Sequence, residues 1–195
     1  GTGKTAGFAL PLLQKLTMEG SQVAANSVRA LVLVPTRELA EQVQQSLLTY
    51  GENLPLRCYA VYGGVSINPQ MMKLRKGIDL LVATPGRLLD LYRQNAVRFD
   101  QLLALVLDEA DRMLDLGFSD DLAELNQLTS QRKQTMMFSA TFAPRIQQLA
   151  MRVMHDGGSS VQKVTIDSPQ EKHANIKQVL YWADNAQHKR KMLDH

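Results

Sequence analysis

Three short groups of residues in this chain have the composition that phosphate chemistry requires, and the first stands at its start. Gly1-Thr2-Gly3-Lys4-Thr5 has the form of the second half of a phosphate-binding loop. Glycines let backbone N–H groups crowd around phosphate oxygens at a helix N-terminus, where the helix dipole favours anions. In such a loop Lys4 reaches the β- and γ-phosphates, and the Thr5 hydroxyl holds Mg²⁺. For this segment taken alone, a chance glycine turn is the alternative.

The second group is the acidic run Asp108-Glu109-Ala110-Asp111, which follows the apolar residues 102–107. Its acids therefore emerge at the carboxyl end of a buried strand, where open α/β sheets bind ligands. A first carboxylate there can hold Mg²⁺ through water, and the next can polarise an attacking water. The alternative is an acidic helix start in which Arg112 compensates Asp111. The phosphate-type loop upstream favours the catalytic interpretation.

The third group is Ser139-Ala140-Thr141, which follows the apolar run 135–138. Its hydroxyls could connect a nucleotide site to something bound elsewhere. Taken alone, it is more simply the N-cap of the next helix.

Three further turns each come directly after an apolar run: Pro35-Thr36-Arg37-Glu38, Gly63-Gly64 and Thr84-Pro85-Gly86-Arg87. Arginines, hydroxyls and free helix N–H groups in such positions suit phosphate oxygens. Each is an ordinary turn by itself, but together they would line one rim of a sheet beside the nucleotide site.

The elements that position these groups alternate between short apolar runs and amphipathic helices. Strands are expected at 30–34, 59–62, 80–83, 102–107 and 135–138. Helices are expected at 38–50 and 144–154, from Pro85 onward, and after the glycine loop, where Pro11 should bend the helix. This alternation predicts an α/β fold with an open, mostly parallel sheet, helices on both faces and right-handed crossovers.

The character of the chain changes after Met154. Residues 155–160 are rich in turn formers, 161–166 could form an edge strand, and 168–175 are polar enough for a linker. A strand over 176–183 and an unfinished helix over 185–195 would begin a second domain. We therefore expect a first lobe over 1–167, a linker over 168–175 and the start of a second lobe over 176–195.

Composition excludes several classes of protein. The chain has 195 residues, 45% hydrophobic and 21% charged, which is typical of a globular protein rather than a disordered or collagen-like one. No apolar stretch is long enough to span a membrane. The single Cys58 rules out a disulfide scaffold, fits a cytoplasmic location and is expected to be a small core residue. The net charge of +3 permits nucleic acid as a partner without requiring it.

Six motifs in this order resemble those of the DEAD-box ATP-dependent RNA helicases. They are Gly-Thr-Gly-Lys-Thr, Pro-Thr-Arg-Glu-Leu-Ala, Gly-Gly, Thr-Pro-Gly-Arg, Asp-Glu-Ala-Asp and Ser-Ala-Thr. The stretch 63–75, GGVSINPQMMKLR, is further similar to the bacterial RhlE-type branch. The resemblance covers essentially the whole chain and implies a RecA-like P-loop fold whose first strand lies upstream of Gly1.

The resemblance also implies roles, residue by residue. ATP phosphates and Mg²⁺ would be bound by Gly1, Thr2, Gly3, Lys4 and Thr5; Asp108 would hold Mg²⁺ through water and Glu109 would act on the hydrolytic water. Asp111, Ser139 and Thr141 would couple the ATP state to lobe closure. The RNA backbone would be gripped by Thr36, Arg37, Gly64, Thr84, Gly86 and Arg87, nearly independently of sequence.

The family's adenine-reading motif and arginine finger have no counterpart in these residues, so the chain by itself is expected to be inactive. Two alternatives to an RNA helicase stay open on sequence alone. One is a P-loop ATPase acting on DNA, and the other is a non-catalytic module that binds RNA or a protein partner weakly. The RNA target and any protein partners are not indicated by the sequence.

Overall fold

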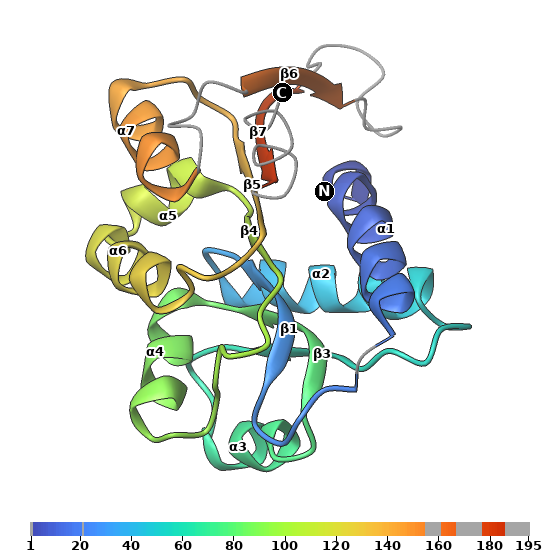
Figure 1. Cartoon of the computed structure of the whole chain (residues 1–195). Helices are drawn as coiled ribbons and strands as arrows, with labels where there is room; N and C mark the ends of the chain where they lie inside the picture. The colour runs from blue at the N-terminus through green and yellow to red at the C-terminus, as the bar shows by residue number, and fades with distance from the viewer. Residues whose placement is uncertain (1, 21, 155–160, 167–176, 186–195) are drawn as a thin grey trace.

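The chain forms a seven-stranded sheet in the order β2-β3-β1-β4-β5-β7-β6 (Figure 1). The computed structural model describes residues 2–20, 22–154, 161–166 and 177–185. The strands are β1 (Val28–Leu33), β2 (Cys58–Val61), β3 (Ile78–Ala83), β4 (Ala104–Leu107), β5 (Gln134–Ser139), β6 (Val161–Ile166) and β7 (Lys177–Asn185). The first five strands are parallel to one another, and β7 runs antiparallel to both of its neighbours. The open, mostly parallel sheet expected from the sequence is confirmed.

Seven helices lie in the described residues. They are α1 (Thr2–Glu19), α2 (Arg37–Tyr50), α3 (Asn68–Leu74), α4 (Pro85–Arg93), α5 (Ala110–Asp115), α6 (Ser119–Leu128) and α7 (Pro144–Val153). Of these, α2 to α6 connect successive parallel strands. Prolines open α4 and α7 and stand early in α3, where a missing N–H costs nothing. Helix α1 continues through Pro11, as expected, while the bend at that residue stays a prediction.

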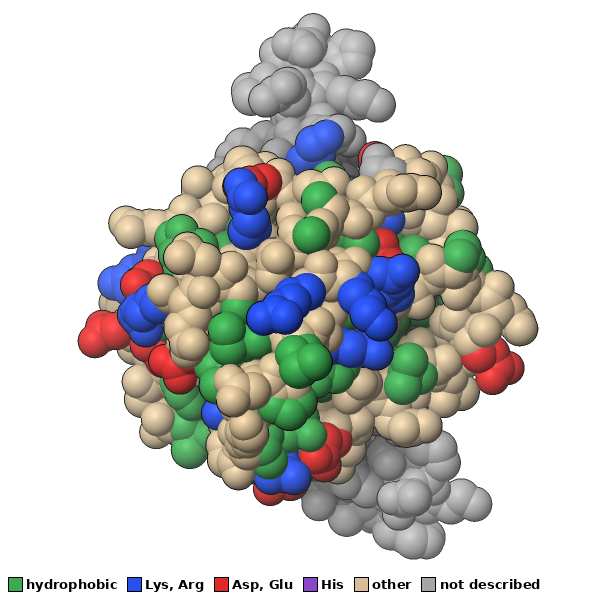
Figure 2. Space-filling model, turned by 90° about the horizontal axis from the view of Figure 1, so that it is seen from below, with side chains coloured by type: hydrophobic (Ala, Val, Ile, Leu, Met, Phe, Trp, Pro, Cys, Tyr) green, Lys and Arg blue, Asp and Glu red, His purple; other side chains and the backbone are tan. Residues whose placement is uncertain are grey.

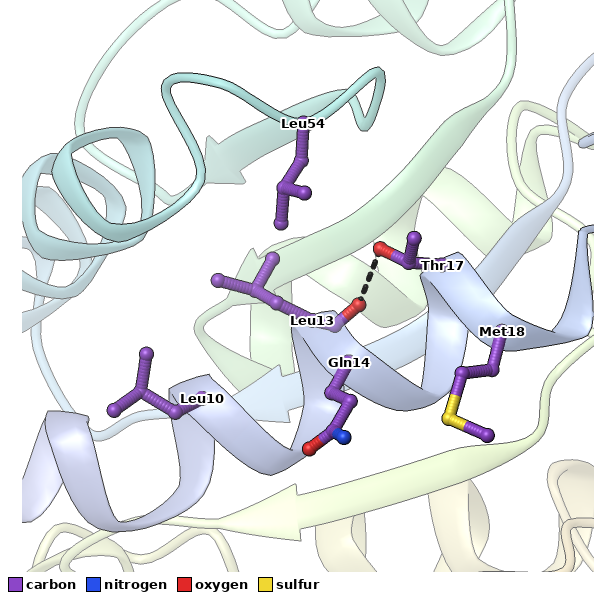
Figure 3. A pocket seen from close by; sticks show the side chains of 6 residues that line it. All are labelled: Leu10, Leu13, Gln14, Thr17, Met18 and Leu54. Atoms are coloured by element: carbon purple, nitrogen blue, oxygen red, sulfur yellow. Dashed lines mark hydrogen bonds between the residues drawn. The ribbon is translucent and has the colours of Figure 1, made fainter.

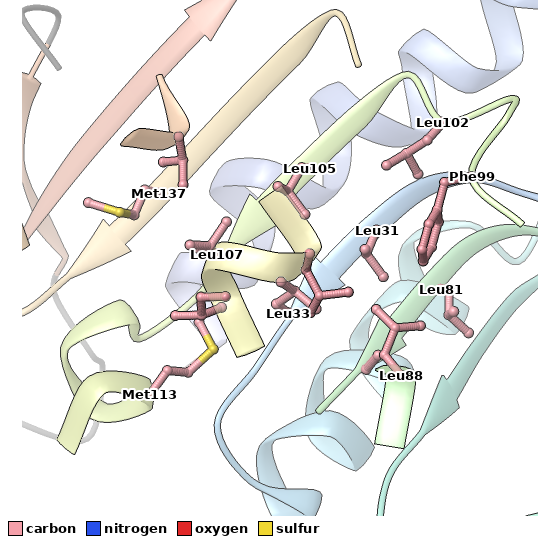
Figure 4. Close-up of a cluster of buried hydrophobic side chains, with 14 of the residues drawn as sticks. Leu31, Leu33, Leu81, Leu88, Phe99, Leu102, Leu105, Leu107, Met113 and Met137 are labelled. Carbon is pink, nitrogen blue, oxygen red and sulfur yellow. The ribbon is translucent and has the colours of Figure 1, made fainter. Parts of the chain in front are cut away.

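Both faces of the sheet are covered by helices, and each face has its own apolar core (Figure 1). Successive residues of β1 alternate between the two cores. Leu31 and Leu33 pack against residues of α4 and α5 such as Leu88 and Met113 (Figure 4), and Val32 packs on the face covered by α1 and α2. Continuously apolar strands are the mark of a sheet buried on both sides, which explains why these runs were recognisable in the sequence.

The amino edge of the sheet is held by a buried ion pair. Arg29 on β1 lies 3.2 Å from the Asp79 carboxylate on β3 and donates a second hydrogen bond to the backbone oxygen of Leu16. The other Asp79 oxygen accepts from the backbone N–H of Arg57, just before β2. One carboxylate therefore fixes the relative positions of α1 and three strands.

The last two described strands join this same sheet. Strand β7 pairs with β5 from Gln134↔Asn185 to Ser139↔Leu180, and β6 pairs with the outer edge of β7. The edge strand expected at 161–166 is confirmed. Sequence analysis assigns residues from 176 onward to a second lobe, whereas Lys177–Asn185 here extends the first sheet. The proposed linker falls within 167–176, outside the described residues, so the division into lobes stays a prediction.

Candidate nucleotide and RNA site

Five parallel strands bring five of the six sequence motifs to one edge of the sheet. Thr36, Gly63, Thr84, Asp108 and Ser139 stand at or just beyond the carboxyl ends of β1, β2, β3, β4 and β5. The strand order then divides this edge into two halves. The arginine- and glycine-containing turns follow β2, β3 and β1, and the acidic and hydroxyl groups follow β4 and β5.

The acidic group sits where β4 meets α5. Asp108 is buried, and its backbone N–H donates to the oxygen of Leu33 at 2.9 Å, which continues the β1–β4 ladder. Glu109 occupies the N-cap position of α5 in the left-handed conformation, with φ 53° and ψ 53°. Its carboxylate is 3.8 Å from Arg112, while Asp111 lies half-buried in the first turn of the helix. The alternative interpretation pairs Arg112 with Asp111, whereas Arg112 lies near Glu109 in the structure. An acidic helix start also does not by itself require the left-handed backbone of Glu109.

The glycine-rich segment forms the beginning of α1. Thr2, Gly3, Lys4 and Thr5 lie in the first turns of this helix, and Gly1 lies outside the described residues. The helix thus begins within the segment that the sequence predicts as a phosphate loop, and a helix N-terminus is a place where anions bind. Farther along, Phe8 of α1 packs against Phe138 of β5, with ring centroids 5.6 Å apart, so the helix start is held beside the strand that ends in Ser139.

Ser139 and Thr141 form a small turn of their own. The Ser139 hydroxyl donates to the backbone oxygen of Thr141 at 3.1 Å and accepts from the Thr141 backbone N–H at 3.3 Å. Ser139 is buried at the end of β5, whereas Thr141 is exposed. The N-cap predicted for the next helix is Ala143 instead, because α7 begins at Pro144 and neither hydroxyl caps it.

On the other half of the edge, the first two turns meet through an aromatic ring. Thr36 caps α2, its hydroxyl accepting from the backbone N–H of Leu39 at 3.2 Å. The guanidinium of Arg37 lies 5.1 Å from the ring centroid of Tyr62, the residue before Gly63. The Tyr62 hydroxyl donates to Glu41 at 2.9 Å, and burial together with this bond raises the tyrosine pKa. The Arg37 side chain is thus held against the Tyr62 ring while about half of its surface stays exposed.

The third turn is joined to the second by Gln70 of α3. Arg87 donates to the Gln70 side-chain oxygen and to the backbone oxygen of Val65, each at 2.9 Å. The Gln70 amide nitrogen donates to the backbone oxygen of Tyr62 at 3.1 Å. Gln70 is 4% exposed, so this polar residue is the buried hub that connects Arg37, the glycine turn and Arg87.

Sequence reasoning did not identify Gln70 or Tyr62 as part of this site. The available signal was a lone glutamine between apolar residues of a short helix, in the stretch 63–75 that carries the branch resemblance. Its role depends on the approach of α3 to Arg87, 17 residues later. The spacing alone therefore could not reveal it.

Two glycines on this rim leave room for a ligand rather than for packing. A Cβ atom added at Gly64 or Gly86 would meet no protein atom within 4 Å. Gly64 also has φ +82°, a conformation that side chains rarely adopt. Gly86 lies in the first turn of α4, beside Thr84, whose backbone N–H bonds to Val61. Close approach of an external backbone would explain both glycines.

The depressions elsewhere on the molecule do not include these motifs. A hollow of about 370 Å³ lies between α1 and Leu54 and is lined mainly by apolar residues such as Leu10, Leu13 and Met18 (Figure 3). No charged side chain lines it, so it is unsuited to a nucleotide. A second hollow, of about 790 Å³, lies near Tyr92 and Phe99. None of the described helices has the length and apolar content needed to cross a membrane.

The fold and this edge define an α/β nucleotide-binding domain whose ligands meet the carboxyl ends of parallel strands. Comparison with known proteins makes the assignment specific. The family model for DEAD/DEAH box helicases matches residues 1–149, and the chain belongs to this family.

Several relatives and solved structures are similar to this chain. The DEAD-box ATP-dependent RNA helicase CshA of Streptococcus pneumoniae is 41% identical over 79% of the chain and 28% of its own length. The RNA helicase CrhR of Synechocystis is 38% identical over 99% of the chain and 37% of its own length. The yeast splicing factor Prp28 superposes with a TM-score of 0.69 at 35% identity, covering 77% of this chain and 36% of that structure. A hypothetical ATP-dependent RNA helicase from Sulfolobus tokodaii superposes with a TM-score of 0.71 at 35% identity, covering 80% of this chain and 44% of that structure. The chain thus spans about a third of the length of these relatives.

Proposed function

We propose that this chain is the ATP- and RNA-binding part of an ATP-dependent RNA helicase, which separates short duplexes by clamping one strand. The observation that carries the proposal is the division of one sheet edge into two halves. Cationic and glycine-containing turns follow β2, β3 and β1, and the acidic and hydroxyl groups follow β4 and β5. The names of CshA and CrhR support the same activity.

On the nucleotide half, the proposed ligand is ATP. Backbone N–H groups of residues 1–3 would surround its phosphates, and Lys4 would neutralise the γ-phosphate as negative charge moves during transfer. Glu109 would orient and deprotonate the attacking water from the position where α5 begins. Because hydrolysis needs all of these groups aligned, we expect the loss of any one to reduce turnover strongly.

Magnesium is part of this proposal through Thr5 and Asp108. Among the described residues no three His, Cys, Asp or Glu side chains come together. Nucleotide-bound Mg²⁺ does not need such a cluster, because phosphate oxygens and water supply most of its ligands. A single buried carboxylate at the end of β4 fits that requirement. When bound, the ion would offset negative charge on the phosphates.

On the RNA half, the proposed ligand is a sugar-phosphate backbone. Arg37 and Arg87 would contact phosphates, Thr36 and Thr84 would contribute hydroxyl or helix N-terminal groups, and Gly64 and Gly86 would permit close approach. The network through Gln70 supports this, since it holds both guanidinium groups in place before RNA arrives. No base edge needs to be read, so binding would be nearly independent of sequence.

Communication between the halves is proposed to run through Asp111, Ser139 and Thr141. The supporting observation is position: α5 packs against β5, and the Ser139 turn ends that strand. These groups would report the ATP state to a second lobe.

We also propose that the chain belongs to the RhlE-like branch, because of the similarity of residues 63–75, and that the protein is cytoplasmic. A phylogeny of complete family sequences tests the branch, and the position of a tagged protein in cells tests the location.

The decisive experiment is a chimera in which this chain replaces the matching region of Streptococcus pneumoniae CshA. We expect RNA-stimulated ATP hydrolysis that Lys4→Ala abolishes and that Lys15→Ala, on the same helix, leaves intact. The 195-residue chain alone is expected to be inactive. Equal turnover in the Lys4→Ala chimera would overturn the proposed role of the glycine loop.

A P-loop ATPase acting on DNA is the nearest competing function, and a non-catalytic binding module is the other. To distinguish the DNA-dependent ATPase from an RNA helicase, ATP hydrolysis by the chimera is measured with RNA and with DNA of the same sequence. An RNA helicase of this family would be stimulated by the RNA. A chimera that folds and binds RNA but hydrolyses no ATP would support the second.

A further inference from the structure

Four cations lie near β2, the edge strand of the described sheet, and are not used by the RNA site described above. They are Arg57, Lys73, Arg75 and Lys76, and we call them the β2-edge cations. Residues 53–78 contain these four and no Asp or Glu, although the whole chain has a net charge of only +3. All four are exposed, and none forms an ion pair with a carboxylate of the described residues.

The fold gathers these cations from two segments. Arg57 precedes β2, and its guanidinium donates to the backbone oxygen of Lys76 at 2.7 Å, just beyond α3. Lys73 lies 5.8 Å from the ring centroid of Tyr59 on β2. Figure 2 views the molecule from below, the side on which α3 lies in Figure 1, and shows Lys and Arg side chains near the middle of this face with most Asp and Glu toward its rim.

Helix α3 and strand β2 connect the β2-edge cations to the proposed RNA rim. Helix α3 leaves the Gly63-Gly64 turn and is bound to Arg87 and Tyr62 through Gln70. Its other end carries Lys73 and is followed directly by Arg75 and Lys76. Strand β2 likewise joins the two: Arg57 precedes it and Tyr62 follows it, and its four residues advance about 10 Å between them. The cations lie toward the amino end of β2, and the rim lies at its carboxyl end. An RNA strand that leaves the rim at Gly64 and runs alongside β2, the edge strand of the described sheet, would therefore reach these cations.

We propose that the β2-edge cations form a second phosphate-binding surface, which holds the part of an RNA strand that extends beyond the rim. This inference rests on the proposed function and adds to it a dependence on RNA length. The alternative is that the cations near the end of α3 only offset its dipole. That alternative does not account for Arg57, which belongs to another segment, and it predicts no effect on RNA binding.

The test measures the affinity of the 195-residue chain for single-stranded RNAs of about six and about sixteen nucleotides by fluorescence anisotropy, at several salt concentrations. The double variant Arg75→Gln, Lys76→Gln should weaken binding of the longer RNA about tenfold at low salt. Its salt slope should fall by about 0.7 for each charge removed. Binding of the shorter RNA should change little, because that RNA does not reach the second surface.

A matched control removes one arginine and one lysine elsewhere, as Lys133→Gln with Arg152→Gln, both exposed. If the two double variants bind the longer RNA equally, the proposal that the β2-edge cations bind RNA is wrong. If Arg37→Ala leaves binding of both RNAs unchanged, the proposed rim is wrong, whatever the β2-edge cations do. Thermal unfolding of each variant shows whether a change in affinity merely follows a loss of stability.

Discussion

Glu109 has the most unusual backbone among the residues of the candidate nucleotide site. It is one of three non-glycine residues with positive φ in the part of the chain that the structure describes, the others being Asn26 and Asn95. Asparagine tolerates this conformation, whereas for glutamate it is costly. Such strain is retained where the surrounding structure requires a side chain to point in a particular direction. Here the strained residue stands where β4 ends and α5 begins.

This geometry gives a prediction for Glu109→Gln in the CshA chimera. The amide keeps the size of the side chain but cannot accept a proton from water, so hydrolysis should slow by about 10² or more. ATP binding should persist, because the phosphates are held elsewhere. Single-turnover hydrolysis and nucleotide titration measure the two effects. Asp115→Asn, at an exposed position on α5 that pairs with Arg145, should change neither; near-normal hydrolysis in Glu109→Gln would remove Glu109 from this role.

Cys58 gives a prediction about pH. Burial, with a smaller contribution from the charge of Asp79, raises the pKa of its thiol from 9.0 to about 11. The folded state therefore holds the proton more tightly than the unfolded state, so this group stabilises the fold below pH 9, and that stability is lost as pH rises toward 11. Alkylation by iodoacetamide at pH 8 should be much slower in the folded than in the urea-unfolded chain. Equal rates would contradict the assignment of Cys58 to the core.

At the scale of elements, the short helix α3 links the proposed RNA rim to the β2-edge cations. It carries Gln70, the hub between two turns, and its last turn carries Lys73, with Arg75 and Lys76 directly after it. Leu74 anchors the helix in the core, and its backbone oxygen accepts hydrogen bonds from Asn26 and Gly77. The orientation of α3 therefore sets the positions of Arg87 and the glycine turn together.

Removing either rim arginine should weaken RNA binding about equally across sequences. For Arg37→Ala and Arg87→Ala we expect the salt slope to fall by about 0.7 each, the single-strand value for one phosphate contact. Anisotropy titrations with two unrelated RNA sequences measure both quantities. Arg93→Ala is the matched control on α4, since Arg93 is exposed and paired with Glu124. A loss confined to one sequence would indicate base reading instead.

The sequence was sufficient to predict which turns share the sheet edge. Each motif follows an apolar run directly, and parallel strands bring their carboxyl ends together whatever the details of packing. It was insufficient for Gln70 and for the Arg29–Asp79 pair, 50 residues apart, because these contacts depend on the approach of elements that are distant in the chain. Residues whose position follows from the local sequence were predictable, and residues that join distant elements were not.

At the scale of the whole molecule, the least expected feature is the course of the chain after Met154. Strand β7 lies between β5 and β6 and contributes to both cores. Leu180 and Trp182 belong to the core on the side of α4 and α5, and Tyr181 packs against Phe138 on the other side, with ring centroids 4.8 Å apart. The β5 strand that ends in Ser139 is therefore paired along both of its edges.

Trp182→Ala tests whether residues 177–185 belong to this sheet or begin a separate lobe. Trp182 is 1% exposed, so its truncation should reduce the free energy of unfolding by about 3–5 kcal/mol, as for other buried aromatic residues. Phe142 stacks on it at 5.9 Å but is 48% exposed, and Phe142→Ala should therefore cost much less. Urea unfolding of the 195-residue chain, followed by circular dichroism, measures both. If Trp182→Ala unfolds like the unmodified chain, β7 does not stabilise the first sheet, and the boundary expected near residue 176 is the better description.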